Sequence, residues 1–323
     1  MKSFDGKIAV ITGGGSGMGR ELVIALASEG CHVSFCDVTE ESMAQTRALA
    51  LARAKAGVRV THFLADVSDE EQVIAFRDAV AAAHETRHLD LLFNNAGIGG
   101  GGSFVLDERE EWDKTFEVCW NGVYFCSRAF IPMLLASPEA HLINTSSVNG
   151  FWASLGPRSA HSAYSAAKFA VKGFSEALVN DFRNNAPHLK VSVVMPGHIG
   201  TGIAINSARL LGRDPKEMSD DQLEDARKRM ERAGFAVGEA SNEQLRQGLQ
   251  MIGEAFRDGA PMTAAEAARI ILDGVRAERW RILVGKDAEA LDRLVREAPE
   301  EAYEQSFMDK VLAQSTWAIG QQR

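Results

Sequence analysis

Strand-like runs of apolar and β-branched residues alternate with longer helical patterns, and this alternation constrains the fold more than any other feature of the sequence. Residues 7–12 (KIAVIT) are typical of a buried strand and are followed by glycines and a helical pattern that reaches Gly30. Because parallel strands need long crossover connections, which helices supply, the pattern predicts an α/β fold. We expect a Rossmann-type, doubly wound parallel sheet with helices on both faces. The other expected strands are residues 32–36, 58–64, 89–93, 141–145, 191–194 and 281–284, and the other expected helices are residues 40–56, 69–85, 108–135 and 162–185.

Two stretches interrupt this alternation. Residues 202–262 form a charged, helix-leaning insert without a strand pattern, in which Leu245, Leu249, Ile252 and Phe256 recur at helical spacing. We expect this insert to be a helical lid over the substrate; packing of its apolar stripe on its own domain or on a second subunit is the alternative. Residues 287–323 are expected to form a helical C-terminal extension. Since no repeat or linker separates these parts, we expect one catalytic domain over residues 1–323.

Composition narrows the possible partners. A net charge of −9 argues against a nucleic-acid or anionic-membrane surface. We find no apolar run long enough to span a bilayer and no signal-peptide pattern, so we expect a soluble, cytoplasmic protein. The cysteines and histidines lack metal-ligand spacing, so we expect no metal site and buried free thiols at Cys31, Cys36, Cys119 and Cys126.

A glycine-rich turn follows the first expected strand and opens the first helix. Its residues include Gly13, Ser16, Gly17, Met18 and Gly19. Glycine permits a tight turn and lets backbone N–H groups approach a pyrophosphate at the helix N-terminus. The second strand ends at Asp37, where an acidic residue would meet the adenosine ribose 2′-hydroxyl and repel a 2′-phosphate. We therefore expect NAD, with NADP less favoured; a plain turn and a helix-capping Asp37 are the structural alternatives.

Tyr164 is the only one of the three tyrosines that has a lysine, Lys168, four residues later. On a helix these two side chains share a face, and a cation beside a phenol favours the phenolate. The pair is therefore a candidate catalytic base, although tyrosine and lysine at this spacing also occur on ordinary helix surfaces.

Together these residues resemble the short-chain dehydrogenase/reductase family, in its single-domain branch with T-G-x-x-x-G-x-G spacing (Thr12, Gly13, Gly17, Gly19). Other motifs follow in order: Asp66-Val67, Asn94-Asn95-Ala96-Gly97, Asn121, Ser146-Ser147-x-x-Gly150, Tyr164-x-x-x-Lys168 and Pro196-Gly197-x-x-x-Thr201. The resemblance extends from Gly6 to about Thr201 and resumes near residues 263–284.

The resemblance implies a role for each matching position. The implied catalytic residues are Asn121, which would hold a water in the proton path, Ser147, which would bond the substrate oxygen, Tyr164 and Lys168. The implied cofactor contacts beyond the glycine turn and Asp37 are Asp66 and Val67 at the adenine, Asn94, Ala96, Gly97, Pro196 and Gly197 along the cofactor, and Ile199 and Thr201 at the nicotinamide carboxamide, while Tyr164 and Lys168 would also contact the nicotinamide ribose. It also implies a homodimer or homotetramer that associates through the helices at residues 108–135 and 162–185.

One departure from the family pattern lies beside the candidate base. Ser147 and Tyr164 are 17 positions apart (164 − 147), which is a few residues more than is usual in the family. We interpret the excess as a loop insertion, in which Phe151, Trp152 and His161 either shape the substrate pocket or serve as ordinary packing residues.

We therefore expect an NAD-dependent oxidoreductase that interconverts a bulky, hydrophobic secondary alcohol and its ketone, with Tyr164 as acid and base and no metal ion. The alternatives are an NADPH-dependent carbonyl reductase, which Asp37 disfavours, and a catalytically silent dinucleotide sensor, which the presence of all four catalytic residues disfavours.

Overall fold

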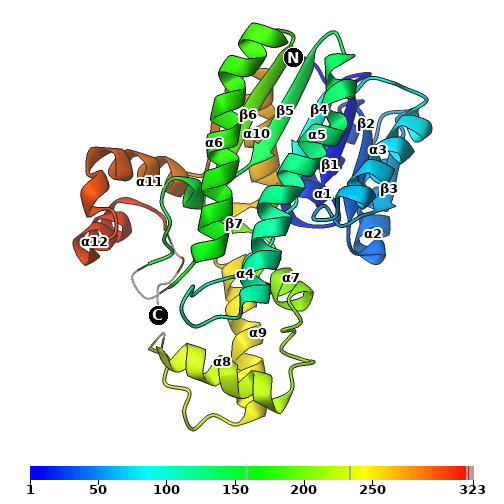
Figure 1. Ribbon diagram of the computed structural model, residues 1–323. Coiled ribbons are helices and arrows are strands. Elements are labelled where there is room, and N and C mark those ends of the chain that lie inside the picture. The colour runs from blue at the N-terminus through cyan, green and yellow to red at the C-terminus, as the bar shows by residue number, and fades with distance from the viewer. Residues whose placement is uncertain (157–158, 233, 318, 320–323) are drawn as a thin grey trace.

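The computed structural model describes residues 1–156, 159–232, 234–317 and 319 (Figure 1). Within them, seven parallel strands form one sheet in the order β3-β2-β1-β4-β5-β6-β9. The strands are β1 (Ile8–Thr12), β2 (His32–Asp37), β3 (Val60–Leu64), β4 (Leu91–Asn94), β5 (Ala140–Thr145), β6 (Leu189–Pro196) and β9 (Arg281–Val284). The strand order reverses between β1 and β4, which is where open α/β sheets bind their ligands. The predicted α/β fold class is confirmed.

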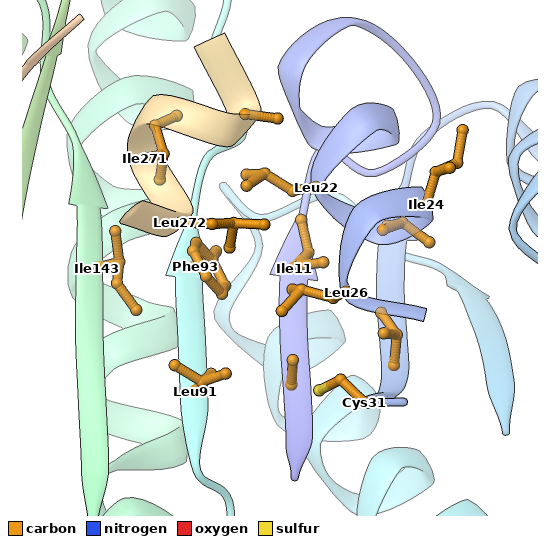
Figure 2. Packing of buried hydrophobic residues seen from close by; sticks show 14 of the residues in the cluster. Ile11, Leu22, Ile24, Leu26, Cys31, Leu91, Phe93, Ile143, Ile271 and Leu272 are labelled. Carbon is orange, nitrogen blue, oxygen red and sulfur yellow. The ribbon is translucent and has the colours of Figure 1, made fainter. Parts of the chain in front are cut away.

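Helices cover both faces of this sheet. The helices α1 (Gly17–Ser28), α2 (Glu40–Leu51) and α10 (Ala264–Arg276) pack on one face, where Leu22, Leu26 and Leu272 meet Ile11 and Phe93 (Figure 2). The other face is covered by α3 (Glu70–His84), α5 (Gly122–Leu135) and α6 (Ser162–Asn185). Because both faces are buried, the strands carry nearly continuous apolar runs rather than alternating ones.

The helix expected at residues 108–135 is interrupted. It begins as α4 (Arg109–Phe116), passes through a π-helical turn (Glu117–Asn121) and continues as α5. The stretch Arg109–Leu135 is also long and apolar enough to cross a membrane by length and composition, contrary to our expectation from the sequence. Half of its most apolar window is buried inside the fold, as in the core helices of many soluble proteins, so this is weak evidence for a membrane span.

The insert contains three helices: α7 (Ile203–Leu210), α8 (Asp220–Arg232) and α9 (Asn242–Asp258). A short strand pair, β7 (Ile199–Gly200) with β8 (Met262–Thr263), joins its two ends. The apolar stripe of α9 packs mainly within the protein, because Leu245 and Leu249 contact the cluster around Leu223 and the ring of Phe256 packs against that of His198 at a tilt. Ile252 is half exposed.

The C-terminal extension is helical as expected over the described residues. It contains α11 (Lys286–Glu297), a 3₁₀ turn (Pro299–Glu301) and α12 (Gln305–Gln314). These elements pack as a separate apolar cluster against the segment that follows β5. Residues 318 and 320–323 of the expected extension lie outside the described residues.

Candidate dinucleotide and catalytic site

The glycine turn between β1 and α1 is built around close backbone approaches. Gly13 has a left-handed φ of 66°, and a Cβ added to it would lie 2.8 Å from the Cα of Ala96. The hydroxyl of Thr12 fixes the facing segment, because it accepts hydrogen bonds from the backbone N–H groups of Asn95 and Ala96, each at 3.0 Å. Side chains larger than hydrogen therefore do not fit at Gly13.

A groove of about 740 Å³ lies over this turn. The predicted cofactor-binding residues that line it are Gly13, Ser16, Gly17, Met18, Asp37, Asp66, Val67, Ala96, Gly97 and Thr201. Lining residues that the sequence interpretation missed include Lys114 of α4 and Asn206 and Arg209 of α7. The amide of Asn206 donates to the hydroxyl of Ser16 at 3.3 Å, so the insert closes one side of the groove. Its volume, its lining by the glycine turn and its carboxylate Asp37 fit a dinucleotide.

Asp37 lines the groove. Its carboxylate accepts hydrogen bonds from the backbone N–H groups of Gly15 at 2.9 Å and Val38 at 2.8 Å. Burial raises the pKa of Asp37 above its ordinary value, although these hydrogen bonds oppose the shift. Asp66 is different, because its carboxylate already binds Lys114 at 2.8 Å. Burial opposes its charge, yet hydrogen bonds from Lys114 and Ser68 hold the pKa of Asp66 below its ordinary range.

Tyr164 and Lys168 lie together on the first two turns of α6. The Lys168 Nζ is 5.3 Å from the centre of the Tyr164 ring and donates to the carbonyl oxygen of Thr145, at the end of β5, at 2.9 Å. A Cβ added to Gly97, which lines the groove, would lie 3.3 Å from this Nζ. The pair is therefore adjacent to the groove.

The protein's own groups raise the pKa of Tyr164 overall, whereas the sequence led us to expect a pKa lowered by Lys168. Burial raises the pKa of Tyr164, the neighbouring Cys119 raises it further, and a hydrogen bond with Ser147 only partly opposes this. Burial also lowers the pKa of Lys168. The reason is desolvation, which disfavours the charged form of each group.

Ser147 begins a 3₁₀ turn (Val148–Gly150) directly after β5. Its Oγ accepts the backbone N–H of Asn149 at 3.1 Å, and its hydroxyl lies close enough to Tyr164 to lower the pKa of that phenol. Since β5 ends next to β4, Ser147 and Tyr164 meet at the same edge of the sheet as the glycine turn. Ser146, the alternative in this motif, instead donates to the carbonyl oxygen of Lys168 at 2.7 Å.

The π-helical turn presents Cys119 to this site. Cys119 is fully buried, its Sγ donates to the carbonyl oxygen of Ile98 at 3.2 Å, and it lies close enough to Tyr164 and Lys168 to raise the pKa of both. Asn121 ends the same π-helical turn, and its role of holding a water in the proton path stays a prediction.

Five other predicted cofactor residues are placed away from the lining of the groove. The Asn94 amide donates to Asn144 and Ser127, each at 2.9 Å, and braces β4 against β5 and α5. Gly19 packs its backbone against the carbonyl of Gly13, and Ile199 packs into the core. Pro196 ends β6, and Gly197 lies against the carboxylate of Asp287.

His161 is a neighbour of Tyr164 that the sequence interpretation named only for the pocket. Its ring centre is 4.7 Å from that of Tyr164. Burial lowers its pKa to about 4, so the imidazole is neutral at pH 7. It also lines a second cavity of about 610 Å³ together with Phe104, Val105 and Phe169.

The cysteines and acidic residues form no metal site in the described part of the chain. All four cysteines are free and buried, as expected. No group of three or more histidine, cysteine, aspartate or glutamate side chains among the described residues is placed to hold a metal ion.

Comparisons with known proteins agree with this geometry. Residues 7–210 match the family described as short chain dehydrogenase. The chain is 34% identical over 297 residues to the "Putative oxidoreductase SadH" of Mycobacterium tuberculosis, which covers 92% of each protein.

Solved structures extend the likeness to cofactor complexes. A short-chain dehydrogenase/reductase from Burkholderia phymatum in complex with NAD has a TM-score of 0.74 and 31% identity, and the match covers 93% of this chain and 96% of that one. A metagenomic short-chain oxidoreductase in complex with NADP has a TM-score of 0.53 and 31% identity, over 60% of this chain and 83% of that one. Homologues therefore bind either dinucleotide. By its sequence and its fold, this chain belongs to the short-chain dehydrogenase/reductase family and is an oxidoreductase of that family.

Proposed function

We propose that the protein is an NAD-dependent oxidoreductase that interconverts a secondary alcohol and its ketone, with Tyr164 as the acid and base. The observation that carries this proposal is the position of Tyr164, with its ring centre 5.3 Å from the Lys168 Nζ and near Ser147, next to a groove lined by the glycine turn. When bound, the dinucleotide supplies the hydride acceptor or donor. The protein supplies the proton transfer and the position of the substrate.

The phenol of Tyr164 exchanges a proton with the substrate oxygen, and Ser147 hydrogen-bonds that same oxygen. Because burial raises the pKa of Tyr164, the protein's own groups favour the protonated phenol, which is the form that donates a proton to a ketone. Oxidation of an alcohol needs the phenolate, and the positive charge of an oxidised nicotinamide favours it. In this proposal Lys168, whose Nζ donates to the carbonyl oxygen of Thr145, also bonds the ribose side of the cofactor.

Asp37 supports NAD over NADP. Its carboxylate lies in the groove, and an additional phosphate there would meet a like charge. Arg20, the nearest cation of α1, already donates to the carbonyl oxygen of Gly15 at 2.7 Å. An NADPH-dependent carbonyl reductase is the second candidate, because a relative of this family is complexed with NADP.

The substrate we propose is bulky and hydrophobic. The cavity that His161 lines is also lined by Phe104 and Val105, whose side chains are 79% and 86% exposed. The insert is tied over this region by ion pairs, since Glu111 of α4 binds Arg213 at 2.6 Å and Arg229 at 3.6 Å. An insert held in this way suits a lid over an apolar substrate. A homodimer or homotetramer through α4–α5 and α6 is part of the same proposal.

The test is the variant Tyr164→Phe, with Tyr124→Phe as the matched control on α5. Turnover on a panel of secondary alcohols and ketones should fall at least about 100-fold in Tyr164→Phe, while NADH affinity, measured by fluorescence titration, stays unchanged. Comparable turnover in Tyr164→Phe would refute the role of the phenol. Wild-type protein that binds NADH yet turns over no member of the panel would favour the dinucleotide sensor.

A further inference from the structure

We propose that the C-terminal segment, residues 286–317, is a positioning element of the catalytic site, and that it acts on Ser147 through Trp152. This inference rests on the proposed function. The segment is remote from the glycine turn in sequence and lies beyond the part of the chain that matches the family, residues 7–210. The helices α11 and α12 (Figure 1) pack against Val148 and Trp152 of the segment that follows β5.

Trp152 carries the contact. It is fully buried and packs edge-on against Trp317, with ring centres 5.6 Å apart, and against Phe307, with ring centres 5.9 Å apart. Its indole Nε1–H donates to the carbonyl oxygen of Ala302 at 2.7 Å. A buried indole N–H needs a hydrogen-bond acceptor. The C-terminal segment supplies this acceptor, the Ala302 carbonyl, together with the aromatic rings that pack on Trp152.

A chain of hydrogen bonds continues from Trp152 to Ser147. The carbonyl oxygen of Trp152 accepts the amide of Asn149 at 3.0 Å, and the backbone N–H of Asn149 donates to the Oγ of Ser147 at 3.1 Å. Because a lone pair of this Oγ is taken by Asn149, the orientation of the Ser147 hydroxyl toward Tyr164 is restricted. The position of Ala302 is thus transmitted to the catalytic hydroxyl through two buried side chains.

A second contact holds the same loop. The backbone N–H of Ala153 donates to the hydroxyl of Tyr303 at 3.2 Å. The rest of the Tyr303 side chain is largely exposed. Its hydroxyl therefore fixes the position of the Ala153 backbone, while its ring buries little apolar surface.

The first turn of α11 also hydrogen-bonds a second loop beside the site, the one that contains His198. Asp287 is buried and accepts the backbone N–H of His198 at 2.7 Å. His198 belongs to the segment between Pro196 and Thr201, of which Thr201 lines the dinucleotide groove. One segment of the chain therefore braces the loop of Ser147 and the loop of Thr201, which flank the same site. Displacement of reacting groups by about 1 Å lowers turnover far more than it lowers binding.

The test is a double-mutant cycle in the full chain with the variants Trp152→Phe and Ser147→Ala, measured on the best alcohol of the panel. Trp152→Phe keeps an aromatic ring but removes the donor to Ala302, so kcat should fall about fivefold or more, with NADH affinity unchanged. In the Ser147→Ala background the same substitution should have no further effect on kcat, because Trp152 acts through Ser147. Tyr303→Phe should give a smaller fall, and Trp280→Phe and Tyr124→Phe, which change exposed rings elsewhere, should give none.

A purely structural role for Trp152 would lower the thermal midpoint and leave kcat unchanged, or would lower kcat equally in both backgrounds, and either result overturns the proposal. Hydrogen exchange of the amides of residues 147–154 supplies a readout that does not depend on turnover. Faster exchange there in Trp152→Phe is expected, and unchanged exchange would overturn the inference. Absence of turnover in the wild type would instead contradict the proposed function and would leave the exchange measurement to judge the positioning role.

Discussion

The substitution of glycine by alanine should have opposite effects at two helical positions of this chain. At Gly19, in the first turn of α1, the new Cβ would overlap the carbonyl oxygen of Gly13 and lie 2.7 Å from the Asn95 amide. At Gly173, in the middle of α6, a new Cβ would meet nothing within 4 Å. Alanine is favoured over glycine in a helix by about 1 kcal/mol, so Gly173→Ala should stabilise the fold by about that amount.

Gly19→Ala receives the same helical gain, but the clash exceeds it. The obstructing atom is backbone, which cannot rotate away, so α1 or the glycine turn must move by about 1 Å. Overpacking of this kind costs about 3 kcal/mol, which leaves a net loss of about 2 kcal/mol. Because the displaced turn is the phosphate cradle, NADH affinity should also fall at least about tenfold, as the loss of one hydrogen bond to a charged group implies.

Urea unfolding followed by tryptophan fluorescence gives both stability changes, and titration of NADH fluorescence gives the affinities. Gly173→Ala should bind NADH like the wild type, so it serves as the control for the replacement of a helical glycine by alanine. A Gly19→Ala variant with wild-type stability and wild-type NADH affinity would refute the close approach of α1 to the turn and the assignment of the groove.

Three further predictions follow from the site and the core. Asp37→Ser should lower the ratio of NADH to NADPH affinity by at least about tenfold, because it removes the like charge that opposes a 2′-phosphate; an unchanged ratio in fluorescence titrations with both dinucleotides would contradict this. Cys119→Ala should lower kcat about fivefold, whereas Cys119→Ser, which keeps a donor for the Ile98 carbonyl, should retain most activity; equal rates for the two variants in a pH–rate profile would argue against a role for that hydrogen bond. Burial lowers the pKa of His141 to about 3 and that of His84 to about 4. The unfolded chain therefore binds protons before the folded protein does, and stability should fall as the pH drops below about 6.5, by about 2 kcal/mol per histidine near pH 5. Urea unfolding midpoints measured at about pH 6.5 and at about pH 5 give this loss of stability. The substitution His141→Gln should reduce the difference between the two midpoints.

The sheet could be predicted from the sequence because its strands are buried on both faces. Runs such as residues 7–12 and 281–284 stand out as continuous apolar stretches, and the structure places strands there with shifts of at most a few residues. The glycine turn and Asp37 were also predictable, since short-range spacing defines them. These features are defined by residues that lie close together in the sequence, so the sequence alone is enough to predict them.

Features that depend on distant contacts were not predictable. In the sequence Cys119 has the pattern of an ordinary buried thiol, and only the folded structure shows that it lies beside Tyr164 and Lys168. The spacing of Leu245 and Leu249 correctly indicated an apolar helix face, but periodicity does not say which surface that face covers. The contact between Trp152 and Ala302 joins residues 150 positions apart, and no local pattern records it. Desolvation of Tyr164 is likewise a property of the folded surroundings.

The π-helical turn makes the length of one helix as important as its composition. A π turn accommodates one residue more than an α turn, so deletion of a single residue between Glu117 and Asn121 would let the helix close in regular form. Everything upstream would then rotate by about 100° around the helix axis relative to α5. Trp112, which donates to the Ser162 hydroxyl at 3.1 Å, and Glu111, which holds the insert, would both turn away from their partners. A frame-preserving loss of one codon at the turn would therefore break the contacts of this helix with the insert and with α6 in a single step.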